Sequence, residues 1–125
     1  MMWLGIDGGG TKTTFSIFDE SLCRINTFRL QTCHFGQVGF DGMKEVLAKG
    51  IHLATHHGLQ GEYGVGLGLC GYGLEDDIRI RMNAIVSEVV GDHPYELTSD
   101  VAAACAASLD LSDGVVIVSG TWSIA

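Results

Sequence analysis

The chain has 125 residues, a length that suits one domain with a buried core and is short for a two-domain enzyme. Fifteen Asp and Glu against seven Lys and Arg give a formal net charge of −8, which disfavours nucleic acid and anionic membranes as partners. An apolar content of 46% argues against disorder, and 18 glycines against one proline predict tight turns and close backbone contacts.

The spacing of the cysteines and the residues at the start of the chain indicate in which cellular compartment the protein is expected. The sequence has no CxxC pair, so its cysteines give neither a zinc signature nor a redox signature. No signal-peptide pattern appears at the start, and no apolar run approaches the roughly 20 residues that a membrane span needs. We expect a reduced, cytoplasmic protein.

The first part of the chain predicts strands followed by a helix. Alternating β-branched and aromatic residues predict three strands, over residues 2–7, 13–19 and 23–30. From Val38 the apolar residues recur at steps of three and four, which predicts an amphipathic helix that ends at Gly58.

After this helix, strands and helices alternate. The sequence predicts a buried strand that runs into a glycine-rich loop, a helix from about Asp77 to Gly91, a short strand, an alanine-rich helix and a last strand with another glycine turn. The buried strand with its loop spans residues 63–73, and the short strand spans 95–99. The alanine-rich helix spans 100–109, and the last strand with its glycine turn spans 114–123.

The resulting order, β-β-β-α-β-α-β-α-β, predicts an α/β fold with a mixed sheet. Three successive strands imply antiparallel hairpins, and the later alternation implies parallel strands joined by crossover helices. We expect a ribonuclease-H-like domain over residues 1–112. Residues 113–125 would then carry the first strand of a second domain whose remainder the chain lacks.

The stretch GIDGGGTKTTF, residues 5–15, is a candidate phosphate-binding loop. It lacks the GK[ST] of a P-loop and the third glycine and following helix of a dinucleotide fingerprint. A hairpin loop remains, in which bare glycine amides approach an anion, threonine hydroxyls donate to it and a lysine adds a cation. Its candidate phosphate ligands are Gly8, Gly9, Gly10, Thr11, Lys12 and Thr13, and Asp7 could hold Mg²⁺ directly or through water. The alternative is a turn that only links two strands.

Three motifs together resemble a known family. GIDGGGTKT, LTSDVAAACAASL and GVVIVSGTWS are similar, in order and spacing, to the first half of the N-acetylglucosamine kinase and BadF/BadG/BcrA/BcrD ATPase family. That family belongs to the actin, hexokinase and Hsp70 superfamily, whose members bind ATP and substrate between two ribonuclease-H-like domains. The resemblance implies ATP and Mg²⁺ as cofactors and a nucleotide and a sugar as partners.

The resemblance also assigns roles to residues. The glycine stretch matches the family's first phosphate loop, and Gly120, Thr121 and Ser123 match the second. Asp100 matches the carboxylate that takes the proton from the attacking sugar hydroxyl and contacts the substrate. From the residues alone, Asp100 is equally well placed as the N-cap of the alanine-rich helix, so both interpretations stay open.

The segment TCHFGQVGF, residues 32–40, falls where the family's sugar-binding loop lies. His34 and Gln37 are candidate ligands for sugar hydroxyls, although a lone histidine is more often structural. The family often has an Asn-Pro pair here, and this chain has His34 and Phe35 instead. In the second phosphate loop, Trp122 stands where the family usually has glycine.

Two kinds of function follow. The first is the N-terminal domain of an ATP-dependent sugar kinase that acts on N-acetylglucosamine or glucosamine, inactive as this fragment alone. The second is a non-catalytic remnant that forms a homodimer through an exposed strand edge near 115–119. A weaker option is the ATPase activator of a dehydratase, but the chain has no matching cysteine motif for an iron–sulfur cluster.

Overall fold

A computed structural model describes residues 1–72 and 75–99 of the chain. The order of its elements agrees with the order predicted for this part of the sequence. The elements are β1 (Met2–Gly8), β2 (Lys12–Phe18), β3 (Arg24–Gln31), α1 (Phe35–His56), β4 (Tyr63–Leu69), α2 (Asp76–Val90) and β5 (Tyr95–Thr98). The predicted helix 100–109 and the predicted strand in 114–123 lie outside the described residues.

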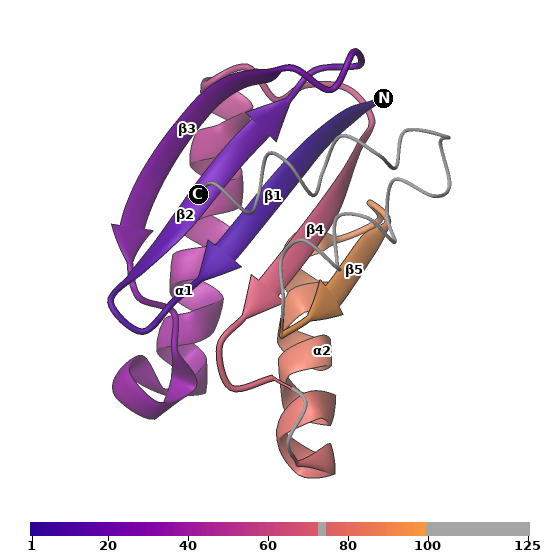
Figure 1. Ribbon diagram of the computed structural model, residues 1–125. Coiled ribbons are helices and arrows are strands. Elements are labelled where there is room, and N and C mark those ends of the chain that lie inside the picture. Colours follow the sequence, from indigo (N-terminus) through magenta and orange to yellow (C-terminus); the bar gives the residue numbers. More distant parts are fainter. Residues whose placement is uncertain (73–74, 100–125) are drawn as a thin grey trace.

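The strands form one mixed sheet in the order β3-β2-β1-β4-β5 (Figure 1). β1 pairs with β2 and β2 with β3 in antiparallel fashion, whereas β4 and β5 run parallel to β1 and β4 respectively. The mixed sheet confirms the predicted α/β class. Both helices cover the same face of the sheet, and they contact each other there (Figure 1).

The core lies between the helices and this face. In a strand, alternate residues share a face, so each of the central strands sends every second side chain toward the helices. Side chains of the strands and of both helices join in one buried cluster, whose largest fully buried members include Phe15, Leu4, Ile6, Met43, Leu47, Leu67 and Met82. The core therefore fixes the register of β1 and β2, and with it the position of the turn that joins them.

Helix α1 begins earlier than the apolar periodicity predicts. Its first turn, from Phe35, precedes Gly39, whereas the amphipathic helix predicted from Val38 corresponds to the part of α1 after Gly39. The Nδ1 atom of His34 accepts a hydrogen bond of 2.9 Å from the N–H of Gly36 and so caps the first turn. Gly39, with φ of 75° and ψ of 171°, then breaks the helical path before the amphipathic part begins.

No helix among residues 1–72 and 75–99 is both long enough and apolar enough to cross a membrane.

Candidate functional site

The candidate site is the turn between β1 and β2. β1 ends at Gly8 and β2 begins at Lys12, and the N–H of Gly9 donates to the carbonyl of Lys12 at 2.9 Å to close the hairpin. This turn lies at the end of the sheet where α1 begins (Figure 1). The fold therefore brings the glycine stretch and the start of α1, which the sequence proposed as phosphate loop and sugar loop, to one end of the sheet.

Three other segments hold the carbonyl groups of the turn. The N–H of Cys70 donates to the carbonyl of Gly8 at 2.9 Å. The hydroxyl of Thr32 donates to the carbonyl of Gly9 at 2.7 Å, and the side-chain amide of Gln37 donates to the carbonyl of Gly10 at 2.6 Å. Three successive carbonyl oxygens are thus bound by the protein itself.

This arrangement sets the direction of the amide groups. Every peptide bond of the described chain is trans, so the carbonyl of one residue and the N–H of the next point in opposite directions. Because the carbonyls of Gly9 and Gly10 point to Thr32 and Gln37, the N–H groups of Gly10 and Thr11 point away from these partners. Within the part of the chain that the structure describes, neither N–H has a protein acceptor. Two neighbouring donors of this kind are suited to an anion.

The three glycines of the turn differ in whether the surrounding atoms leave room for a β-carbon. A β-carbon at Gly8 would lie 2.7 Å from Leu69 Cδ2 and 3.0 Å from Cys33 Sγ, so packing alone explains this glycine. At Gly9 and Gly10 the nearest atoms would be 3.5 and 4.0 Å away, and neither residue has a positive φ. The described fold therefore does not require glycine at these two positions, whereas a ligand that approaches the backbone would.

Of the three side chains predicted to help at the turn, two lie at the surface and one is buried. Thr11 and Lys12 are exposed. Thr13 is fully buried, and its hydroxyl donates to the carbonyl of Gln31 at 2.9 Å. We therefore assign the Thr13 hydroxyl to pairing between β2 and β3, because donation to a phosphate would cost this bond.

Asp7 and Cys33 lie close to the turn. Asp7 is half-buried and stands opposite Thr14 of β2 and Gly68 of β4 in the sheet. Cys33 is buried against Gly8, and this burial raises the pKa of its thiol; the charge of Asp7 acts in the same direction, more weakly. A carboxylate oxygen has the chemistry that Mg²⁺ prefers.

His34 and its neighbours form a stacked column beside the turn. The His34 ring stacks on Phe35 with centroids 5.0 Å apart, and Phe35 stacks on Phe40 at the same separation. The guanidinium of Arg81 on α2 lies 4.3 Å from the centre of the Phe40 ring. Since Nδ1 of His34 caps α1, only Nε2 of its ring is left for a ligand.

The structure identifies two residues that sequence reasoning missed, Thr32 and Cys70. Both contribute to the carbonyl contacts of the turn. Thr32 opens the segment 32–40 and Cys70 lies in the loop after β4, but no role was predicted for either, and both are distant from the turn in sequence. The predicted residues Asp100, Gly120, Thr121 and Ser123 lie outside the described residues. Among residues that are described, no group of three or more His, Cys, Asp or Glu side chains could hold a metal ion.

The fold is shared with sugar kinases. The chain is similar to an inorganic polyphosphate/ATP-glucomannokinase from Arthrobacter sp. strain KM, with 20% identity and a TM-score of 0.61 over 93% of this chain and 51% of that one. It is also similar to a ROK hexokinase from Thermus thermophilus, with 23% identity and a TM-score of 0.56 over 93% of this chain and 39% of that one. The sequence matches no protein-family model and no curated protein.

A third similar structure is a candidate N-acetylglucosamine kinase from Chromobacterium violaceum. Its identity to the chain is 18% and its TM-score is 0.50, over 78% of this chain and 33% of that one. At these identities the likeness establishes a common fold. The chain spans about half of the first structure and 39% and 33% of the other two.

Proposed function

We propose that the chain is the N-terminal part of an ATP-dependent sugar kinase and that the β1–β2 turn binds phosphate groups of the nucleotide. The observation that carries this proposal is the pair of outward-facing N–H groups at Gly10 and Thr11, fixed by the contacts from Thr32 and Gln37 to the carbonyls behind them. The exposed ammonium of Lys12 adds a positive charge next to this pair. Because phosphoryl transfer depends on positioning and charge neutralisation, these are the groups that it needs.

The remaining roles come from the resemblance of the motifs to the N-acetylglucosamine kinase family. Asp100 would take the proton of the attacking sugar hydroxyl, and Gly120, Thr121 and Ser123 would form the second phosphate loop. Asp7 would hold Mg²⁺, directly or through water, and the bound ion would neutralise phosphate charge. The proposed sugar is N-acetylglucosamine or glucosamine, and the proposed domain is ribonuclease-H-like, as in the actin-like ATPases.

Hydrogen bonds within the protein limit which atoms of Gln37 and His34 could contact a sugar. Gln37 uses one side-chain N–H on the turn, so its second N–H and its oxygen would be available to a sugar hydroxyl. His34 would contribute Nε2 only. The proposed sugar contacts are therefore the side-chain oxygen or second N–H of Gln37 and one nitrogen of His34, whose ring is held by stacking on Phe35.

The test is a kinase assay on the complete natural gene product with Mg·ATP and N-acetylglucosamine or glucosamine. We expect ADP to form only with sugar present and the Asp100→Asn variant to lose turnover while it keeps nucleotide binding. The matched control is Asp92→Asn, which changes an exposed carboxylate after α2. Unchanged turnover in Asp100→Asn would overturn the base assignment, and absence of nucleotide binding in the unaltered protein would overturn the proposed function.

A further inference from the structure

Gln37 lies in the first turn of α1, and its side chain is directed to a backbone group rather than to open solvent. The distance of 2.6 Å from its Nε2 to the Gly10 carbonyl is short for an N–H···O bond. The two residues are 27 positions apart in sequence, so this contact exists only in the folded chain.

We propose that Gln37 is a positioning residue for the anion-binding turn, an inference that rests on the phosphate role proposed above. A peptide plane beside glycine can rotate with little steric hindrance, since glycine lacks a β-carbon. If the plane between Gly10 and Thr11 rotated by half a turn, its carbonyl oxygen would face the anion in place of the Thr11 N–H. The hydrogen bond from Gln37 favours the orientation in which a donor faces outward.

Thr32 has the corresponding effect on the preceding peptide plane. Its hydroxyl donates to the Gly9 carbonyl and so directs the Gly10 N–H outward. Thr32 is buried and also accepts from the N–H of His34, so its place is fixed by the fold. Gln37 is exposed, and its side chain is therefore the more easily displaced of the two.

The position of Gln37 also depends on the other residues of the segment 34–40. The His34 cap holds the first turn of α1, and the rings of Phe35 and Phe40 tie this segment to Arg81 on α2. Gly39 permits the non-helical backbone that separates this turn from the rest of α1. The segment proposed to contact the sugar is thus linked through one side chain to the turn proposed to contact phosphate.

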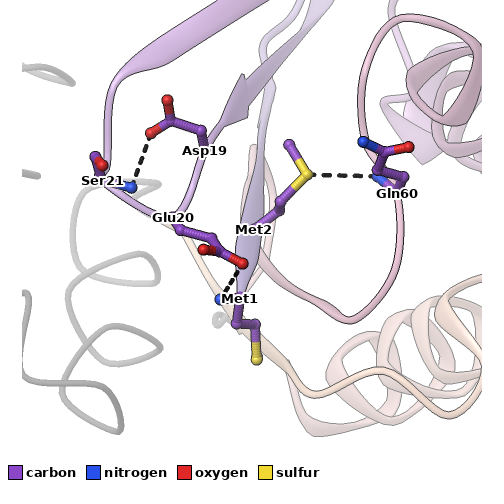
Figure 2. A network of polar contacts seen from close by, with 6 residues as sticks. All are labelled: Met1, Met2, Asp19, Glu20, Ser21 and Gln60. Atoms are coloured by element: carbon purple, nitrogen blue, oxygen red, sulfur yellow. Dashed lines mark hydrogen bonds and ion pairs between the residues drawn. The ribbon is translucent and has the colours of Figure 1, made fainter.

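The experiment compares the affinity of inorganic pyrophosphate for the unaltered chain and for Gln37→Met, which keeps the length of the side chain and removes the donor. Gln60→Met is the control, because Gln60 is exposed at the opposite end of the sheet and its contact with the sulfur of Met2 uses its backbone N–H, not its side chain (Figure 2). Calorimetry gives the affinity. The amide chemical shifts of Gly10 and Thr11 without ligand report the orientation of the turn.

We expect Gln37→Met to bind pyrophosphate about fivefold more weakly, in line with the loss of one neutral hydrogen bond. We also expect it to shift the Thr11 amide resonance before ligand is added. Gln60→Met should match the unaltered chain in both. Equal affinity and unchanged Thr11 shift in Gln37→Met would overturn this inference alone. No binding to the unaltered chain would instead overturn the phosphate role of the turn, and with it this inference.

Discussion

The two hairpin turns of the antiparallel part of the sheet satisfy their polar groups in opposite ways. The turn between β2 and β3 uses its own aspartate: one oxygen of Asp19 accepts from the N–H groups of Ser21 and Cys23 (Figure 2 shows the first of these). Two backbone bonds, between Asp19 and Cys23 and between Leu22 and Asp19, complete this turn. Its donors therefore point inward.

The turn between β1 and β2 has its carbonyls bound by other segments and its donors directed outward. Thr32, Gln37 and Cys70 supply the contacts. This turn is held in place by three parts of the fold, yet among residues 1–72 and 75–99 the N–H groups of Gly10 and Thr11 have no acceptor. The two turns therefore differ in the direction in which their free or paired N–H groups point. In the β1–β2 turn this direction is set by contacts from the rest of the protein to its peptide planes, and the proposed anion role depends on it.

The largest expected effect concerns the glycine that packing requires. Gly8→Val should lower the free energy of unfolding by about 1–3 kcal/mol, because the added carbons overlap Leu69 and Cys33. Gly10→Ala, where the nearest atom would be 4.0 Å away, should leave stability unchanged or slightly higher. Urea unfolding measures both. Equal losses in the two variants would contradict the distinction between packed and open glycines in this turn.

The second prediction removes the internal acceptor of the β2–β3 turn. Asp19→Ala leaves the N–H groups of Ser21 and Cys23 without their carboxylate and should cost about 1 kcal/mol of unfolding free energy. Pyrophosphate affinity should not change. Glu20→Ala is the control, since its exposed ion pair with the amino terminus, at 3.6 Å, contributes little. A loss of anion binding in Asp19→Ala would show that the two turns do not act separately.

The third prediction tests the charge beside the outward amides. Lys12→Ala should weaken pyrophosphate binding about tenfold at low ionic strength, because it removes a charge-assisted contact. Lys44→Ala changes the net charge equally but removes an ammonium that pairs with Glu88 on α2 at 2.7 Å. Calorimetry on both variants separates a local contact from a general effect of net charge. Equal weakening would point to net charge alone.

The smallest expected effect is a pH dependence of the free energy of unfolding, caused by the Cys33 thiol packed against the β1–β2 turn. Burial raises the pKa of the Cys33 thiol above its ordinary value of 9.0, so above about pH 9 the folded protein holds more protons than the unfolded chain. The free energy of unfolding should therefore fall as pH rises from 8 to 10. Cys33→Ala should flatten this dependence, whereas Cys23→Ala, in the exposed β2–β3 turn, should keep it. Urea titrations at each pH provide the measurement, and identical slopes in both variants would contradict the assignment.

The sequence predicted the described strands and helices because their signals are local. Alternation placed β2 within one residue of its observed bounds, and the acidic start and the terminal glycine of α2 marked that helix. The start of α1 could not be predicted in this way, because it depends on a histidine cap rather than on apolar spacing. Close contacts such as Gly64 beneath the Trp3 ring, where a β-carbon would lie 2.2 Å from the ring, depend equally on the folded chain.

The candidate site was predictable in part for the same reason. Three adjacent glycines, a lysine and an aspartate are visible in the sequence as a phosphate-loop pattern. The contacts from Thr32, Gln37 and Cys70 join positions 23 residues apart or more, so no local pattern indicates them. The burial of Thr13 also follows from pairing with β3 rather than from its neighbours in sequence.

The measurement that tests the central claim most directly is a pyrophosphate titration of the ¹⁵N-labelled chain, followed by amide chemical shifts. The account predicts saturable shifts of the Gly10 and Thr11 amides, with the amides of Ser21 and Cys23 unchanged. Shifts of similar size in both turns would indicate nonspecific binding. No shift at Gly10 and Thr11 would contradict the assignment of the β1–β2 turn as a phosphate site.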